Sequence, residues 1–398
     1  PVVQQGTTFH TAVSTLRAQD AINNFNASGD NITTNNNLSA FSLSAFTNIV
    51  VGTKHNTVDN NSSTVLGGKF NSTKGEFNVV VGGCTNSAGN TNETDNFIGG
   101  GKSNYNKGNQ GVIVGGEGNK IKIGANHSTI GGGQINEIHC SEGTIGGGYF
   151  NRILSAGHNT IGGGKFNYIN GKYNAIAGGC GNLVLAEEGG VDNDDNFIGG
   201  GTGNRVRVGS GNNGALNSVI GGGNLNSLSG ASNAVIGGGH TNRICGDQSM
   251  IGTGFRNIIG NDALRSFMGS GLCNRILSAH GFIGAGNRNT VGGGHGSIIN
   301  GACNQLADDG TANISQCSFS TIANGCCNNL SADFSFIGGG FRNSLSSDFG
   351  FIGSGSNNKA SFGNYAFIGS GVNNVVFNRY AFIGNGCGNN NQLGEFSS

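Results

Sequence analysis

A short pattern of apolar and polar positions repeats along most of the chain. Residues 145–153, with the sequence IGGGYFNRI, align with residues 161–169, with the sequence IGGGKFNYI, and 21 such units can be aligned. The first position of the unit is isoleucine in 17 copies, valine in three and methionine in one, and an Ile, Val or Leu follows eight residues later in 16 copies. The commonest spacing between units is 15 residues, and the longest insertions precede Ile198, Ile220 and Ile322.

A unit of 15 residues is too short for a pair of helices and fits one coil of a β-solenoid. Two short strands in each coil would stack on those of the next coil at ~4.8 Å, with both apolar positions facing a common core. We therefore predict an all-β fold, a parallel β-solenoid of about 21 coils over residues 48–391.

The two ends of the chain lack the repeat. Residues 1–47 are expected to form an N-terminal connector or cap, with a short amphipathic helix over 11–25 and an irregular or strand-like linker over 26–48. Residues 392–398 are a short C-terminal tail. Because uncapped solenoid ends tend to stack, the N-terminal segment either caps its own solenoid or docks onto the C-terminal coils of the next subunit and so builds a filament.

Glycine and asparagine occupy fixed positions in the unit. Glycine stands three residues after the first position in 20 of 21 copies, as tight corners with positive φ require, and asparagine stands six residues after it in every copy. A sugar- or metal-binding role would not require the same residue in every coil, so we interpret the asparagines as a structural ladder of stacked amides. The candidate ladder residues are Asn56, Asn104, Asn119, Asn136, Asn151, Asn167, Asn182, Asn204, Asn226, Asn242, Asn257, Asn274, Asn289, Asn304, Asn328, Asn343, Asn358, Asn373 and Asn389.

The residue just before the first position is mostly apolar, although strand neighbours point to opposite faces. A row of outward phenylalanines is a large exposed patch unless a partner covers it, which predicts a homo-oligomer with solenoids side by side; the alternative is a monomer with an apolar face. A second aromatic column, from Phe319 to Tyr380, lies two residues further back. The interface candidates are Phe97, Phe197, Phe267, Phe282, Phe336, Phe351, Phe367 and Phe382.

Composition excludes several classes of protein. The 398 residues include 78 glycines but one proline, which excludes collagen, and 24 phenylalanines argue against disorder. The 21 basic residues equal the 21 acidic ones, so net charge provides no attraction to nucleic acid, and no apolar run is long enough for membrane insertion as a helix.

Candidate chemistry is sparse, and we expect no enzyme and no cofactor. Acidic clusters at 187–195 and 308–309 are typical of solvated loops, and the one weak calcium candidate is the group Asp192, Asp194 and Asp195. The ten cysteines form no CxxC motif. Cys303 and Cys327 share a column in adjacent coils and could form a disulfide, although Cys317 competes for either partner and free thiols are the alternative.

Units such as NTIGGGKFNYINGKYNAIAGG, residues 159–179, resemble the head repeats of trimeric autotransporter adhesins. They are also similar to Gly-Gly-Gly-x-x-Asn repeats in fibre-like proteins of bacteria, phages and giant viruses. The resemblance covers about residues 48–391 and implies a left-handed parallel β-roll, three chains per rod, and an extracellular position on a cell or virion surface. The chain departs from the adhesin pattern because neither a heptad stalk nor membrane-anchor strands follow Ile383.

Two functions fit these observations best. The first is a structural subunit of an extracellular fibre, whose partner is the protein itself, as a trimer or a filament. The second is an adhesin or receptor-binding fibre that recognises a glycan or another host-surface ligand, with loops 185–195 and 307–318 as its binding candidates. Ice binding would need a regular threonine array, and only Thr129, Thr144 and Thr160 are consecutive.

Overall fold

The computed structural model is an all-β solenoid of about 21 turns spaced about 15 residues apart, which confirms the predicted fold class. It describes residues 25–28, 31–34, 48–51, 55–59, 62–155, 157–186, 193–209, 214–306 and 317–391. These residues contain no helix, and hence none that could cross a membrane. Internal contacts divide the chain into unit 1, Pro1–Gly181, and unit 2, Asn182–Ser398.

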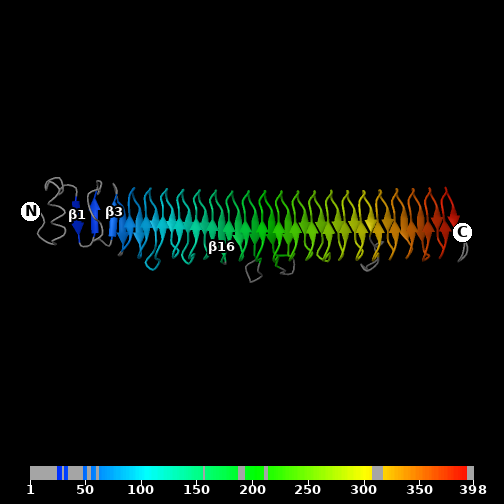
Figure 1. The fold of residues 1–398 in the computed structure, drawn as a ribbon, viewed down its shortest axis with the longest axis horizontal. Coiled ribbons are helices and arrows are strands. Elements are labelled where there is room, and N and C mark those ends of the chain that lie inside the picture. The colour runs from blue at the N-terminus through cyan, green and yellow to red at the C-terminus, as the bar shows by residue number, and fades with distance from the viewer. Residues whose placement is uncertain are drawn as a thin grey trace, which may run out of the picture. The chain divides into compact units, whose positions relative to one another are not determined.

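Unit 1 consists of two sheets, and each coil contributes one strand to each (Figure 1). Sheet 1 contains β1 (Phe25–Ser28), β2 (Asn31–Thr34), β3 (Asn48–Val51), β5 (Thr64–Val65), β7 (Val79–Val80), β9 (Phe97–Ile98), β11 (Val112–Ile113), β13 (Thr129–Ile130), β15 (Thr144–Ile145), β17 (Thr160–Ile161) and β19 (Ala175–Ile176). Sheet 2 contains β4 (Thr57–Asp59), β6 (Ser72–Lys74), β8 (Ser87–Ala88), β10 (Tyr105–Asn106), β12 (Lys120–Ile121), β14 (Glu137–Ile138), β16 (Arg152–Ser155) and β18 (Tyr168–Asn170).

Unit 2 repeats this arrangement with its own strands of the two sheets. Sheet 1 contains β21 (Phe197–Ile198), β23 (Val219–Ile220), β25 (Val235–Ile236), β27 (Met250–Ile251), β29 (Phe267–Met268), β31 (Phe282–Ile283), β33 (Ser297–Ile298), β35 (Thr321–Ile322), β37 (Phe336–Ile337), β39 (Phe351–Ile352), β41 (Phe367–Ile368) and β43 (Phe382–Ile383). Sheet 2 contains β20 (Leu183–Leu185), β22 (Arg205–Arg207), β24 (Ser227–Ser229), β26 (Arg243–Ile244), β28 (Ile258–Ile259), β30 (Arg275–Ile276), β32 (Thr290–Val291), β34 (Gln305–Leu306), β36 (Asn329–Leu330), β38 (Ser344–Ser346), β40 (Lys359–Ser361), β42 (Val375–Val376) and β44 (Asn390–Asn391).

The two-residue strands follow directly from the repeat. In β15 and β17 the threonines Thr144 and Thr160 pair with each other, and so do the isoleucines Ile145 and Ile161. Both isoleucines are fully buried, as is Ile153 eight residues after Ile145, because alternate residues of a strand point to opposite faces. The two predicted apolar positions therefore form the core, and equivalent residues of successive coils lie in register.

Where it is described, the N-terminal segment forms strands, which is one of the two forms expected for the linker. Strands β1 and β2 form an antiparallel pair, and β2 pairs in parallel with β3, which begins the regular stack. Phe25, the last residue of the predicted helix, begins β1, and the rest of that helix lies outside the described residues, as does the tail 392–398. Part of the predicted linker is therefore a strand pair that extends sheet 1.

Candidate functional site

The ladder asparagines lie at the start of each sheet 2 strand and use their amides within the chain. The Nδ2 of Asn151 donates to the carbonyl oxygens of Gly147 and Gly164, both at 2.9 Å, and its Oδ1 accepts the backbone N–H of Asn167 at 3.1 Å. Asn151 is fully buried. Each asparagine thus joins its own coil to the next, and because the side chain is buried and bonded within the chain it is not presented to a ligand.

One predicted ladder residue is wrong, and two members were omitted. Asn373 is exposed and has a φ of 57°. The adjacent Asn374 is buried, and the N–H of Asn374 donates to the Oδ1 of Asn358 at 3.1 Å. The inward position is the sixth after Ile368, which is Asn374. Asn71 and Asn86 also belong to the ladder, because the N–H of Asn86 donates to the Oδ1 of Asn71 at 3.0 Å.

Sequence reasoning missed a second ladder, two residues before each sheet 1 isoleucine. The Oδ1 of Asn96 accepts the N–H of Gly111 at 3.0 Å. The Oγ of Ser128 accepts the N–H of Gly143 at 3.1 Å and donates to the carbonyl of Cys140 at 3.0 Å. Asn, Ser, Gly and Ala alternate at this position, so no single residue type marks it in the sequence. The buried members therefore look like ordinary small spacers until the coils are stacked.

The three glycines of a Gly-Gly-Gly unit have different surroundings. Gly148, the corner glycine, has a φ of +92°, and an added Cβ would lie 2.1 Å from the carbonyl oxygen of Gly164. A Cβ on Gly146 would lie 2.3 Å from the carbonyl oxygen of Gly162. A Cβ on Gly147 would meet no atom within 4 Å, and its φ lies outside the left-handed region. The fold of the single chain requires the third glycine; at the first position other coils have Val81, Val114 and Ile299, and the middle glycine is left unexplained.

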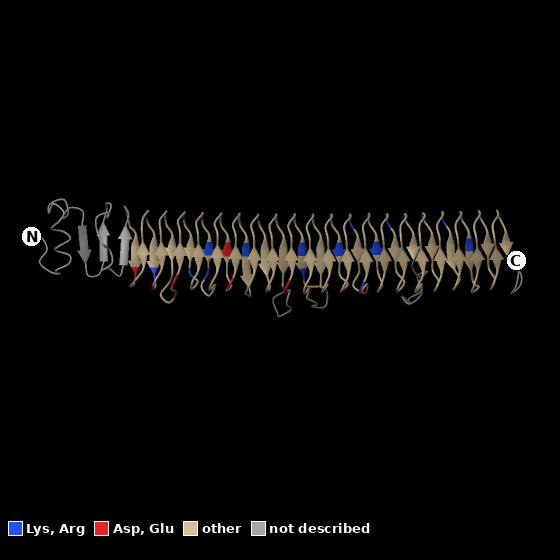
Figure 2. Ribbon diagram, viewed as in Figure 1, with Lys and Arg blue, Asp and Glu red and all other residues tan. Residues whose placement is uncertain are grey.

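Charged side chains of unit 1 pair across neighbouring strands of sheet 2 (Figure 2). Glu137 on β14 forms ion pairs with Lys122, His139 and Arg152. Its carboxylate oxygens lie 2.9 Å from Lys122 Nζ, 3.3 Å from His139 Nε2 and 2.8 Å from Arg152 Nη2. Burial opposes ionisation of this carboxyl, but hydrogen bonds from Lys122, Arg152 and His139 outweigh it and lower the pKa of Glu137 from 4.5 to about 2.

The Glu137 cluster makes stability depend on pH. A carboxyl with a lowered pKa in the folded state stabilises the protein above its unfolded pKa of about 4.5 and loses this contribution as the pH falls towards about 2. We expect Glu137→Gln to cost about 1–2 kcal/mol at neutral pH, allowing for solvent screening, and to cost progressively less as the pH falls from about 4.5 through about 2. Urea unfolding of both proteins at several pH values measures this difference. Glu117→Gln, at the exposed Lys102–Glu117 pair, is the control and should have a small effect throughout.

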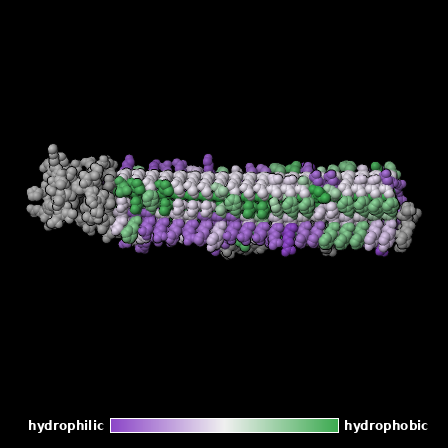
Figure 3. All heavy atoms as spheres, viewed as in Figure 1, coloured by the Kyte–Doolittle hydropathy of each residue, from purple (hydrophilic) through white to green (hydrophobic). Residues whose placement is uncertain are grey.

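Two aromatic columns lie on the surface of unit 2. The predicted interface phenylalanines stack in sheet 1, with ring centroids 4.9 Å apart for Phe351 and Phe367. Several of them are exposed in the single chain. The exposed fraction is 48% for Phe382 and 36% for Phe97, which belongs to unit 1. Figure 3 shows hydrophobic side chains in rows along the coils towards the C-terminal end of unit 2.

The second aromatic column extends further than predicted. Besides the five residues from Phe319 to Tyr380, it includes His280 and His295, whose rings are 4.3 Å apart, and His295 stacks on Phe319 at 4.5 Å. The signal was available, because both histidines stand three residues before a sheet 1 isoleucine, as Phe319 does. All of these residues occupy left-handed corners, with φ between 52° and 64°.

The calcium candidate lies partly outside the described residues, and the candidate disulfide does not form. Asp194 and Asp195 are described but Asp192 is not, and the described residues contain no group of three potential metal ligands. The predicted disulfide is absent, since Cys303 and Cys327 are free thiols on left-handed corners with φ of 53° and 60°. The acidic residues at 187–188 and 308–309 lie outside the described residues.

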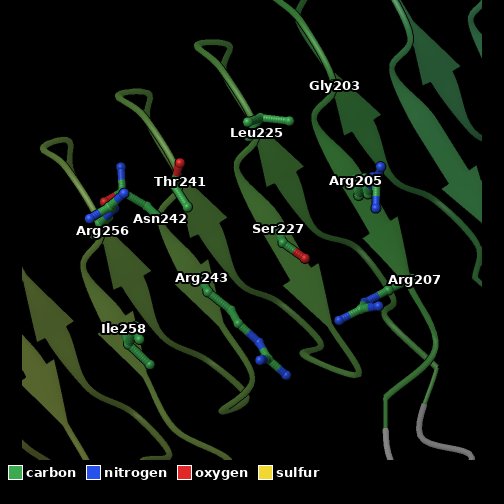
Figure 4. Close-up of a pocket in the computed structure, with 10 residues that line it drawn as sticks. All are labelled: Gly203, Arg205, Arg207, Leu225, Ser227, Thr241, Asn242, Arg243, Arg256 and Ile258. Carbon is green, nitrogen blue, oxygen red and sulfur yellow. The ribbon is translucent and has the colours of Figure 1, made fainter. Parts of the chain in front are cut away.

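A shallow groove of ≈ 470 Å³ opens over sheet 2 of unit 2 (Figure 4). Arg205 and Arg243 project from β22 and β26, and Arg256 projects from the neighbouring corner. Ser227 and Thr241 add hydroxyl groups between them. The groove is therefore a basic and hydroxylated surface, without the paired carboxylates or nucleophile and base that hydrolysis would use.

Comparison with known proteins adds no relative. No family model matches the chain, and no curated protein shows significant similarity to it.

Proposed function

We propose that this protein is a structural subunit of an extracellular fibre, built by solenoids of several copies that associate side by side. The extracellular location and three chains per rod are what the resemblance to adhesin heads implies. The support from the molecule itself is a self-stacking fold of low charge whose outer face of sheet 1 fits close contact with another chain. No catalytic arrangement among the described residues favours an enzyme.

The observation that carries this proposal is the middle glycine of the Gly-Gly-Gly units. Its Cβ position is open and its φ is accessible to other residues, yet glycine is kept in coil after coil. Later coils of unit 2 have Thr253, Ser270 and Ala285 at the same position, so a side chain is compatible with the coil itself. A strip without side chains suits close approach of a second backbone. Members of the strip with an open Cβ position and an accessible φ are Gly82, Gly100, Gly115, Gly147, Gly163, Gly178, Gly222 and Gly238. Gly132 and Gly200 also have open Cβ positions, but their φ of +154° and +150° itself favours glycine, so they do not count towards the strip.

The aromatic column of sheet 1 supports the same proposal. Phe197, Phe267 and Phe282 are 36% to 41% exposed, two residues before a first-position glycine in the same coils. A row of exposed apolar side chains is typical of a protein–protein interface and would be a solubility problem on a monomer. The row meets the glycine strip in the coil of Phe97 and Gly100, whereas the coils of Phe267 and Phe282 have Ser270 and Ala285 at the strip position. Another copy that covers both would bury apolar area without clashes.

A side chain added to the glycine strip tests the proposal. In Gly147→Gln/Gly163→Gln the glutamines meet open solvent within one chain but would obstruct a neighbouring chain. We expect the wild type to have a multiple of the subunit mass by light scattering, and the double variant to dissociate with an unchanged circular dichroism spectrum. Ser270→Gln, at the same position of a coil that already has a side chain, is the control and should keep the oligomer. A monomeric wild type, or a double variant of unchanged mass, would contradict the proposal.

End-to-end growth is a separate part of the proposal. The last described strands, β43 and β44, leave one edge of each sheet unpaired, and β1 to β3 add an antiparallel pair at the other end of the chain. Free sheet edges favour pairing with another chain. Deletion of residues 1–47 should shorten filaments seen by negative-stain microscopy, and long filaments after the deletion would eliminate docking through this segment.

A further inference from the structure

Unit 2 presents a stripe of exposed arginines along sheet 2. Arg205, Arg243 and Arg275 are the first residues of β22, β26 and β30, which are alternate strands, and all three are exposed. Figure 2 shows these strands as single blue strands separated by tan ones. Arg256 and Arg288 are exposed on the corners of the coils between and after them. We call these five residues the arginine stripe.

The stripe is regular in both spacing and direction. Strand neighbours lie ~4.8 Å apart, so Arg205, Arg243 and Arg275 follow one another at ~10 Å. From Arg243 to Arg288 each coil places one arginine on its sheet 2 strand or on the corner before that strand, in alternation, which gives one positive charge about every 5 Å along this face of the stack.

No carboxylate of the described residues neutralises these arginines. The ion pairs of the described residues all lie in unit 1, where Glu137 occupies the same strand position and pairs with Arg152. The described acidic residues of unit 2 lie in the turns that lead from sheet 2 to sheet 1, whereas the corner arginines Arg256 and Arg288 lie in the opposite turns. Cations without acidic partners on one face create a positive potential there, although the net charge of the chain is zero.

Neutral side chains separate the strand arginines, and they are hydroxylated at Ser227 and Thr290 but apolar at Ile258, which stands between Arg243 and Arg275. In the groove of Figure 4, Ser227 stands between Arg205 and Arg243 on the strands, and Thr241 precedes Arg256 on the corners. Thr290 follows Arg275 on β32. The surface therefore offers guanidinium forks for oxyanions with hydroxyls between them, and the guanidinium of Arg256 is held over the ring of Phe255 at 4.8 Å.

We propose that the arginine stripe binds a linear acidic polysaccharide, with sulfate or carboxylate groups at intervals of about 5 Å along its length. Cations separated by the hydroxyls of Ser227 and Thr290 and by the apolar Ile258 match a polymer in which anionic groups alternate with neutral sugar surface. The stripe has no exposed row of aromatic rings between its arginines, which single-stranded nucleic acid would use for base stacking. A second copy is a poorer match, because Asp247, Asp333 and Asp348 already accept backbone N–H groups of their own chain.

This inference does not rest on the fibre proposal, because the stripe lies on sheet 2 and the glycine strip adjoins sheet 1. It assigns a ligand class and a surface to the alternative function, a fibre that binds a glycan. The surface lies within the regular coils, not in the loops 185–195 and 307–318.

The test measures binding of the full chain to defined oligosaccharides by fluorescence anisotropy. The probes are a sulfated heparin dodecasaccharide, a polyuronate of the same length and neutral dextran. We expect the wild type to bind one or both acidic probes and not dextran, with the stronger of the two identifying sulfate or carboxylate as the anion. Arg205→Gln/Arg243→Gln/Arg275→Gln should weaken that binding by at least about tenfold and flatten its salt dependence, because fewer counterions are released.

Matched variants separate the stripe from charge in general. Arg265→Gln/Arg379→Gln removes two arginines from the turns that bear the aspartates, and it should leave affinity nearly unchanged. Replacement of the three strand arginines by lysine should retain part of the binding, since the charges remain and the planar forks are lost. Thermal unfolding of each variant checks its fold.

Several results would overturn the inference. Equal binding of dextran, or unchanged affinity in the triple glutamine variant, would show that the stripe is not the site. Tighter binding of single-stranded DNA than of either acidic oligosaccharide would assign the stripe to nucleic acid. A fall in oligomer mass in the triple variant, without loss of oligosaccharide binding, would make the stripe a contact between copies.

Discussion

Gly148→Ala should destabilise unit 1 by more than about 4 kcal/mol, whereas Gly147→Ala should change the free energy of unfolding by less than about 0.5 kcal/mol. The corner glycine has a φ of +92°, and its added methyl group would lie 2.1 Å from the oxygen and 2.9 Å from the nitrogen of two backbone groups at Gly164 and below contact distance of Asn151. Backbone atoms of the next coil cannot move away without breaking their own ladder. The adjacent glycine has open space and an accessible φ.

Urea unfolding followed by circular dichroism compares the two variants under identical conditions. The pair is well matched, because the residues are neighbours and the substitution is the same. Equal destabilisation by both substitutions would show that the middle glycine has a role within the single chain, and the interface argument built on it would then fail. A tolerated Gly148→Ala would contradict the left-handed corner itself.

Asn151→Ala should cost about 3–5 kcal/mol, the second largest effect that we expect. The substitution removes three hydrogen bonds: it leaves the N–H of buried Asn167 without its side-chain acceptor, and it removes a donor from the partly exposed carbonyls of Gly147 and Gly164, the latter of which keeps the N–H of Tyr149 at 2.9 Å. Each orphaned buried group costs about 1–3 kcal/mol, so the loss exceeds that of an ordinary surface hydrogen bond.

Asn92→Ala is the control for this ladder variant, because Asn92 is exposed in a turn of the same unit. Its free energy of unfolding should differ from that of the wild type by less than about 0.5 kcal/mol. Unfolding monitored together with amide hydrogen exchange would show whether the loss is confined to the coils around Asn151. A loss below about 1 kcal/mol at Asn151 would mean that water replaces the amide, and the ladder would then be dispensable.

The core and the principal ladder could be predicted from the sequence because both depend on local alternation. Ile145 and Ile153 point inward wherever two-residue strands flank a corner, and the period of the unit repeats that geometry in each coil. Asn151 has the same dependence on position, so one residue type in one column was sufficient to identify it. The error at Asn373 arose because two asparagines are adjacent there. Only the count of six residues from Ile368 shows that Asn374, and not Asn373, points into the solenoid.

Other features depended on which residues the stacked coils bring together. Ser128 and Asn96 belong to one ladder although their residue types differ, and His295 stacks on Phe319 across an insertion of unequal length. The net charge of zero did not reveal that the stripe arginines and the aspartates of unit 2 lie in different parts of the coil, because a net charge contains no information on where the charges lie. The sequence by itself determined the solenoid, its core and its corner glycines, since each follows from a local period. Only the tertiary structure decided which glycine has no role within the single chain and which arginines have no carboxylate partner. Both depend on contacts between coils.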